Sequence, residues 1–487
     1  MDFYSIEFFT FFFIVLTVFF LCPQRFRWFV LLFASYYFYG SFKVQYIALL
    51  AFSTLIAYFT ALGMQRHPEK PKRIIFLLLS LFCNIGILFL FKYYDFLTNS
   101  IQQLLGSCNI PYKGHTLNLI VPLGISFYVF QVVSYSIDVY RGEKTPEKHL
   151  GIFALYVAFF PKLLAGPIER AKQLIPQLHE NSRIDWARIT NGLKLMTWGL
   201  FKKVVIADRL AAFVNVVYAD PSAYQGISLV VAVVFYSFQI YCDFSGYTDI
   251  AIGIAQVFGL RLTDNFARPY AAASVAEFWR RWHISLTSWL RDYLYIPLGG
   301  NRVKTARLYL NYIVVFFICG LWHGASWTFA VWGLIHGLYL TFGISLRGFR
   351  EKFTSIIGLN RFPALHRSIQ IITTFTLISL AWIFFRANTI SDALYIISHL
   401  HVGWGKVFNF ETLSSMILLT RSTTEFLIAI SVLLFFGVVH FTEKHTNMRQ
   451  MFAGKPLWLR FAVYYIMVTG ILLLSLPGAQ KFIYFQF

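Results

Sequence analysis

The sequence has 487 residues, of which 57% are hydrophobic and 19% aromatic, whereas only 13% are charged. A soluble protein carries about twice that charged fraction, so a soluble fold is excluded and the apolar excess indicates helices that face lipid. The 42 Lys and Arg exceed the 22 Asp and Glu, which gives a formal net charge of +20. These cations lie in short connectors between apolar runs, which indicates cytoplasmic loops and argues against nucleic acid as a partner.

The first 22 residues do not read as a cleaved signal, because Asp2 and Glu7 stand where a basic region should be. Apolar runs follow one another through the first 150 residues, at 8–21, 28–39, 44–62, 74–91 and 119–137. The basic connector 65–73 is the clearest cytoplasmic loop. Placing Arg25, Arg27 and the basic residues at 141–148 on the same side puts the N-terminus and the polar loop 96–118 outside.

The middle of the chain is less regular. The apolar run 152–160 is too short to cross a bilayer, and the segment 191–217 carries Lys194, Lys202 and Lys203 in an apolar helical pattern. Such segments are tolerated at membrane depth only when protein or water surrounds them, so we expect re-entrant pieces here. Two apolar runs, 227–241 and 250–260, flank a polar stretch, and an amphipathic helix rich in Trp and Arg is predicted at 276–294.

The remaining apolar runs lie at about 308–320, 327–342, 371–385, 426–441 and 460–476, which brings the total to roughly ten or eleven crossings of about 20 residues. We find no internal repeat, flexible linker or soluble domain. The sequence therefore predicts an all-α polytopic membrane protein with one integral-membrane domain over residues 1–487. The five cysteines are scattered and no histidine lies in a zinc-binding pattern, so neither a disulfide framework nor a metal site is predicted.

The first candidate for chemistry is the stretch 320–327, which joins two apolar helices. We expect His323 to end one helix and Ser326 to cap the next. A neutral imidazole held among tryptophans, such as Trp322, is a suitable general base near neutral pH. The alternative is a buried histidine whose polar atoms are satisfied by a carbonyl, and the local sequence favours neither. His336 lies 13 residues further on and is predicted to be a packing residue.

The second candidate is the stretch 278–293. On a continuous helix Trp279, His283 and Thr287 would share one face, while Arg280 and Arg281 would point towards lipid head groups or a bound anion. The alternative is an interfacial helix that Trp and Arg anchor.

The third candidate is Asp243, which lies in an apolar region and should have a partner, such as a nearby arginine or histidine. It could orient a catalytic histidine or form a structural ion pair.

Taken in order, these stretches resemble the membrane-bound O-acyltransferase family, in the branch that acts in alginate O-acetylation. The resemblance covers roughly residues 20–345, followed by C-terminal helices at about 346–487. Its motifs are Phe160-Pro161-Lys162-Leu163-Leu164-Ala165-Gly166-Pro167-Ile168, Phe238-Gln239-Ile240-Tyr241-Cys242-Asp243-Phe244-Ser245-Gly246-Tyr247, Trp282-His283-Ile284-Ser285-Leu286-Thr287, Trp289-Leu290-Arg291-Asp292-Tyr293-Leu294-Tyr295-Ile296-Pro297-Leu298-Gly299-Gly300, Leu321-Trp322-His323-Gly324 and Trp332-Gly333-Leu334-Ile335-His336-Gly337.

The resemblance implies a bundle of tilted helices around a central funnel, with re-entrant and interfacial helices. It implies that His323 and His283 are catalytic, and that the protein is an integral protein of the bacterial inner membrane. The remaining candidates for a supporting role are Asp243, Trp322, Arg280, Arg281 and Ser285.

The implied reaction takes an acetyl group from cytoplasmic acetyl-CoA, with no tightly bound cofactor, and passes it across the membrane. An extracytoplasmic acetyltransferase of the SGNH type then places it on a polysaccharide such as alginate or peptidoglycan. His323 could act as a base or carry the acyl group. Arg280 and Arg281, or Lys202 and Lys203, could meet the phosphates of the donor.

A transporter or flippase without acyl-transfer chemistry is the alternative, motivated by Asp243 and the broken helices. Transporters often carry paired repeats, and their absence from the sequence counts against it.

Overall fold

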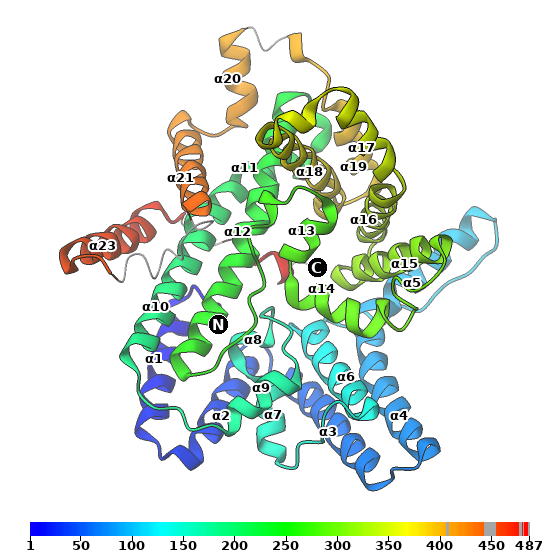
Figure 1. The fold of residues 1–487 in the computed structure, drawn as a ribbon, viewed down its shortest axis with the longest axis vertical. Helices are drawn as coiled ribbons and strands as arrows, with labels where there is room; N and C mark the ends of the chain where they lie inside the picture. Colours follow the sequence, from blue (N-terminus) through cyan, green and yellow to red (C-terminus); the bar gives the residue numbers. More distant parts are fainter. Residues whose placement is uncertain (406–408, 443–453, 477–479, 481, 486–487) are drawn as a thin grey trace. The chain divides into compact units, whose positions relative to one another are not determined.

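The computed structural model describes residues 1–405, 409–442, 454–476, 480 and 482–485, and the described residues form helices without a β-strand (Figure 1). Eight described helices are long and apolar enough to cross a membrane, which confirms an all-α polytopic protein. They are Gln45–Arg66 (α3), Lys70–Ser107 (α4 with α5), Ile227–Phe258 (α12), Thr305–His323 (α15), Trp327–Ser345 (α16), Pro363–Arg386 (α18), Thr423–His440 (within α21, Thr423–Thr442) and Leu457–Leu474 (α23).

The difference from the expected ten or eleven crossings comes from short helices. The apolar runs near the N-terminus and at 119–137 form α1 (Ile6–Leu21, 16 residues), α2 (Arg27–Gly40, 14 residues) and α6 (Ile125–Arg141, 17 residues). A helix needs about 20 residues to cross the hydrocarbon core at 1.5 Å per residue, so these three fall short by length.

Residue contacts divide the chain into two compact units. Unit 1 comprises residues 1–196 and 248–264, and unit 2 comprises residues 197–247 and 265–487. The single integral-membrane domain over residues 1–487 stays a prediction.

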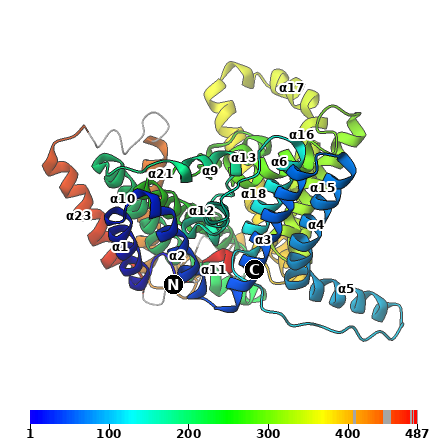
Figure 2. The ribbon, with the colours of Figure 1, turned by 90° about the horizontal axis from the view of Figure 1, so that it is seen from below.

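Unit 1 is organised around α3, α4 (Lys70–Leu88) and α6, which pack against one another (Figures 1 and 2). Buried polar side chains join these helices. Ser53 donates to Asn84 Oδ1, and the hydroxyls of Ser80 and Ser136 lie 2.8 Å apart. Small polar residues at such contacts allow close approach of helices in lipid and hydrogen-bond across them.

The polar loop expected at 96–118 is partly helical. A π-helical turn, Phe89–Tyr93, continues α4 into α5 (Tyr94–Ser107), and Figure 2 shows α5 running on beyond α3, α4 and α6. The carboxylate of Asp95 accepts hydrogen bonds from the backbone N–H groups of Leu117 (2.7 Å) and Asn118 (2.9 Å). One acidic side chain on α5 therefore holds the returning connector.

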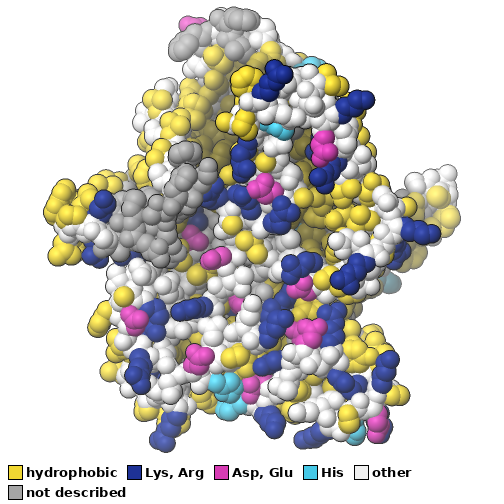
Figure 3. Space-filling model, viewed as in Figure 1, with side chains coloured by type: hydrophobic (Ala, Val, Ile, Leu, Met, Phe, Trp, Pro, Cys, Tyr) yellow, Lys and Arg dark blue, Asp and Glu magenta, His cyan; other side chains and the backbone are white. Residues whose placement is uncertain are grey.

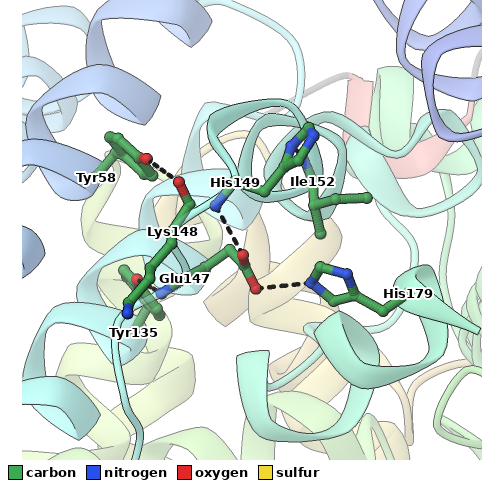
Figure 4. Close-up of polar contacts among 7 residues, drawn as sticks. All are labelled: Tyr58, Tyr135, Glu147, Lys148, His149, Ile152 and His179. Atoms are coloured by element: carbon green, nitrogen blue, oxygen red, sulfur yellow. Dashed lines mark hydrogen bonds and ion pairs between the residues drawn. The ribbon is translucent and has the colours of Figure 1, made fainter.

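The basic connector after α6 is fixed by a polar cluster around Glu147 (Figure 4). Its backbone N–H donates to Tyr135 Oη (2.9 Å), and its carboxylate accepts from the His149 amide (2.8 Å) and lies 2.9 Å from His179 Nε2. Partial burial opposes ionisation, but these hydrogen bonds outweigh it and hold the pKa of Glu147 below its usual value. The helices α7 (Leu150–Ala158) and α8 (Phe160–Leu163) follow, and both are too short to cross, as the sequence indicates.

In unit 2, α15 packs closely against α16. Two facing glycines allow it. A Cβ added to Gly320 would lie 2.2 Å from the carbonyl oxygen of Phe329, and one added to Gly333 would lie 2.2 Å from that of Phe316. Backbone oxygens cannot move aside, so both positions require glycine for this approach.

One of the two irregular stretches predicted from the sequence turns out differently. The polar stretch around Asp243 does not break the helix, because α12 runs unbroken over 32 residues. The segment 191–217 is also helical, as α10 (Trp186–Leu200), a π-helical turn (Phe201–Ala207) and α11 (Asp208–Ala219). π-helical turns often occur at functional positions in helices, and this one carries Lys202 and Lys203.

The outer face of α23 is apolar. Figure 3 shows apolar side chains along it, and Leu457, Trp458, Phe461, Tyr465 and Leu472 are exposed. In a membrane protein such a surface is covered by lipid tails. The helix therefore contributes lipid-facing area to unit 2.

Candidate active site

His283 lies at a break between two short helices of unit 2. The first, α13, spans Val275–Arg281 and the second, α14, spans Ile284–Leu290. His283 adopts a left-handed backbone conformation with φ of 43°, which ends the first helix. The continuous helical face predicted for Trp279, His283 and Thr287 is therefore wrong. A non-glycine residue in this conformation is strained, and such strain clusters at functional sites.

Asn265 holds this break in place through its side-chain oxygen. Oδ1 accepts hydrogen bonds from the backbone N–H of Ser285 (3.1 Å) and from the Ser285 hydroxyl (2.8 Å), and it lies 3.2 Å from His283 Nδ1. A backbone N–H can only donate, so Oδ1 is identified as the acceptor and His283 Nδ1 as a donor. The neutral imidazole then carries its lone pair on Nε2.

Burial keeps the His283 ring neutral. Its side chain is 0% exposed, and loss of solvation lowers the pKa of His283 to about 3. A neutral imidazole with its proton fixed on Nδ1 keeps a lone pair on Nε2 near pH 7, although the low pKa makes it a weak base.

His323 is the last residue of α15, as predicted, and Ser326 caps α16 by accepting a hydrogen bond from the Thr328 amide at 3.3 Å. The side chain of His323 is 3% exposed. Its ring centroid lies 6.5 Å from that of His283, although the two residues are 40 positions apart in the sequence. The fold thus brings both predicted catalytic histidines into one buried cluster.

Aromatic rings enclose the two imidazoles. Trp322 lies 4.8 Å from His323 and 5.9 Å from His283 between ring centroids, and Phe244 of α12 lies 4.7 Å from His283. Trp332 and Phe385 each lie 5.2 Å from His323. Water-poor surroundings strengthen every electrostatic interaction inside such a cluster.

Tyr484 completes the cluster from a distant part of the sequence. Its ring centroid lies 5.6 Å from that of His323, 6.4 Å from that of His283 and 4.4 Å from that of Phe244. A phenol is therefore placed beside both histidines.

A buried ion triad holds the segment that carries Tyr484. Lys203 Nζ lies 2.8 Å from a carboxylate oxygen of Asp243 and 2.8 Å from one of Asp208, and it donates to the carbonyl oxygen of Gln480 at 2.9 Å. Asp243 also accepts from the Ile483 backbone N–H at 2.8 Å. The partner of Asp243 is thus a lysine, not the expected arginine or histidine, and its contacts are those of a structural ion pair.

The other residues predicted for the site differ in how far they are buried. Trp322 and Ser285 are buried next to the histidines, whereas Arg280 is exposed and Arg281 pairs with Glu277 one turn earlier in α13. Lys202 is buried and donates to Ser245 Oγ at 2.9 Å. Of the four cations suggested for donor phosphates, Arg280 is exposed, Arg281 is partly exposed, and Lys202 and Lys203 are buried.

Sequence reasoning missed three contributors to the site: Asn265, Tyr484 and the role of Lys203. Asn265 lies 18 residues before His283, and no local pattern links them. Tyr484 lies in an aromatic run whose density is the one signal that could have drawn attention to it. Lys203 was singled out only for its charge. Within the described residues, no group of three or more His, Cys, Asp or Glu could hold a metal ion.

Comparison with known proteins identifies the family. A sequence model of the MBOAT, membrane-bound O-acyltransferase, family matches residues 31–386. The peptidoglycan O-acetyltransferase of Helicobacter pylori is 39% identical over 399 residues, which cover 76% of this chain and 72% of that protein. The probable alginate O-acetylase AlgI of Pseudomonas putida is 36% identical over 498 residues, 97% of each chain. The teichoic acid D-alanyltransferase of Bacillus subtilis is 25% identical over 239 residues, 46% of this chain and 59% of that protein.

Proposed function

The chain belongs to the membrane-bound O-acyltransferase family and is a multi-pass O-acyltransferase, and from this premise we propose that it moves an acetyl group across the membrane for O-acetylation of an exported polysaccharide. The observation that carries the proposal is the burial of His283 and His323 in one aromatic cluster with ring centroids 6.5 Å apart. Relatives named for peptidoglycan and for alginate acetylation support acetyl as the transferred group.

Three tasks follow for the residues of the cluster. They must position an acyl donor, take a proton from the acceptor and stabilise the charge that develops on the acyl oxygen. His323 takes the proton, or carries the acyl group for part of the cycle. His283, whose proton is fixed on Nδ1 by Asn265, presents Nε2 as a second proton acceptor.

We further propose cytoplasmic acetyl-CoA as the donor, a substrate that is not tightly bound. Its thioester is an activated acyl group, and the exposed Arg280 supplies a cation for its phosphates. The protein would act in the bacterial inner membrane, in contact with its lipids. A separate extracytoplasmic acetyltransferase of the SGNH type would receive the acetyl group and place it on the polymer, such as alginate or peptidoglycan.

The experiment replaces His323 by Ala in cells and measures ester-linked acetate released from the exported polymer by mild alkali. We expect loss of acetylation, with normal amounts of the protein in the membrane. Replacement of His366, a partly exposed histidine of α18, is the matched control and should leave acetylation unchanged. Unchanged acetylation in the His323→Ala variant would contradict the proposal.

A transporter without acyl-transfer chemistry makes a different prediction. Its motivation was a charged Asp243 inside the membrane, but that carboxylate is neutralised by Lys203 and bonded to the Ile483 amide. Proteoliposomes that show substrate-dependent flux unaffected by His323→Ala would favour this alternative.

A further inference from the structure

Two buried N–H groups of α16, one of them on the ring next to His323, have no acceptor among the described residues. Trp332 and His336 lie one turn apart on α16, are both 0% exposed, and have ring centroids 4.8 Å apart. The ring centroid of Trp332 also lies 5.2 Å from that of His323. Neither Trp332 Nε1 nor His336 Nε2 has a hydrogen-bond partner among the residues that the structure describes.

The protonation of His336 follows from its neighbour on α13. The indole Nε1–H of Trp279 donates to His336 Nδ1 at 3.2 Å. An indole nitrogen can only donate, so His336 Nδ1 must hold a lone pair, and the neutral ring carries its proton on Nε2. Both groups without a partner, Trp332 Nε1 and His336 Nε2, are therefore hydrogen-bond donors.

Among the rings packed around His336, Tyr339 carries an oxygen that could accept, but His336 Nε2 makes no hydrogen bond with it. The rings packed around His336 are Trp279, Phe316, Trp332, Tyr339 and Trp382. The indole of Trp382 donates to Tyr270 Oη at 3.2 Å, so it is already satisfied. Buried donors are nearly always paired in native proteins, and an exception deserves an explanation in terms of function.

We propose that Trp332 Nε1–H and His336 Nε2–H form the subsite for the carbonyl oxygen of the acyl group. The inference rests on the proposed function, because an acyl transferase must bring such an oxygen to His323. Two neutral donors in an apolar cluster suit a carbonyl that becomes an oxyanion, since donors fixed in advance cost no reorganisation when charge develops.

The step balances with the residues named. The acceptor oxygen bonds to the carbonyl carbon while its proton passes to the imidazole of His323, and the π electron pair moves onto the carbonyl oxygen. The two N–H groups hold this oxyanion. The pair then returns to re-form the C=O bond, the bond from carbon to the thioester sulfur breaks, and the thiolate takes the proton from His323.

Replacement of Trp332 by Phe tests the subsite, because it keeps an aromatic ring and removes the N–H. Trp382→Phe is the matched control, because it makes the same change in size in a ring that stacks on Trp332 with centroids 5.6 Å apart. The N–H that it removes donates to Tyr270 Oη. With acetyl-CoA as donor in membrane vesicles, we expect Trp332→Phe to lower kcat by about 10²–10³-fold with little change in KM. Trp382→Phe should lower it by less than about tenfold.

His336 provides the second arm. His336→Met removes the donor and should lower kcat as Trp332→Phe does, whereas His336→Gln keeps an N–H donor and should recover part of the loss. Amounts in the membrane and melting temperatures of all variants are measured in parallel, so that a loss of fold is recognised.

Equal losses in Trp332→Phe and Trp382→Phe, or losses confined to KM, would overturn the subsite. A different result would contradict the proposed function, namely acyl transfer that persists in the His323→Ala variant. If His323→Ala abolishes transfer while Trp332→Phe behaves like Trp382→Phe, the subsite alone is wrong.

Discussion

At the scale of single residues, the site depends on one amide oxygen. Asn265 Oδ1 accepts hydrogen bonds from the Ser285 backbone N–H, the Ser285 hydroxyl and His283 Nδ1. These bonds fix the backbone at the helix break and the tautomer of the imidazole. Three donors converge on one acceptor because His283 has a left-handed backbone that turns the start of α14 towards Asn265. The amide of Asn265 is thus a positioning group for His283.

Replacement of Asn265 by Asp keeps the acceptor and adds a negative charge. We expect the charge to raise the pKa of His283, because an opposite charge favours the imidazolium. Protonated His283 cannot accept a proton, so activity falls as pH decreases through the raised pKa. An opposite charge can raise the pKa of His283 from about 3 to about 6, so the ratio of acyl-transfer rates at pH 5 and pH 8 should drop by up to about tenfold relative to the wild type. An unchanged ratio in a folded variant would show that His283 Nε2 does not accept a proton in the rate-limiting step.

At the scale of elements, the position of His323 depends on how closely α15 approaches α16. We expect Gly320→Ala to destabilise the protein by about 1–3 kcal/mol, because the new methyl group meets the Phe329 carbonyl oxygen at 2.2 Å. Gly343→Ala on α16 has open space around its Cβ and should be neutral or stabilising. Melting temperatures in detergent distinguish the two variants. Equal melting temperatures would contradict the packing argument.

The positions of residues 480 and 482–485 depend on a second contact between elements, the buried ion triad. Replacing Lys203 by Met leaves Asp208 and Asp243 buried without their cation, which should cost about 3–5 kcal/mol and release the segment from the histidines. We expect loss of acyl transfer. The double variant Lys203→Met with Asp243→Asn should recover part of the stability because fewer charges are left buried. A double variant no more stable than Lys203→Met would argue against the ion triad.

At the scale of the whole molecule, the sequence could predict the class and the histidines but not their surroundings. Apolar runs of about 20 residues predict membrane-spanning helices, and the order of the motifs identifies His283 and His323. Asn265 and Tyr484 come to the site only through tertiary folding, so local spacing carries no trace of them. The single helix predicted at 276–294 is two helices in the structure. The sequence pattern on either side of His283 is helical, and it does not show that the left-handed backbone of His283 changes the direction of the chain.

The predicted orientation of the connectors can be tested with a native cysteine. Cys108 is exposed in the connector that the basic residues place outside, whereas Cys242 and Cys319 are buried. A membrane-impermeant maleimide should label Cys108 in intact spheroplasts, and Cys108→Ser should abolish that label. Labelling that requires permeabilised membranes would reverse the orientation.

The central claim is that His283 and His323 act together in acyl transfer. The most direct test is the initial rate of labelled-acetyl incorporation into exported polymer for His283→Ala, His323→Ala and the double variant. Residues that act as a unit give non-additive losses. We predict that each single variant loses at least about 10²-fold and that the double variant is no slower than the slower single variant. Full activity in either single variant, or losses that multiply in the double variant, would contradict the account.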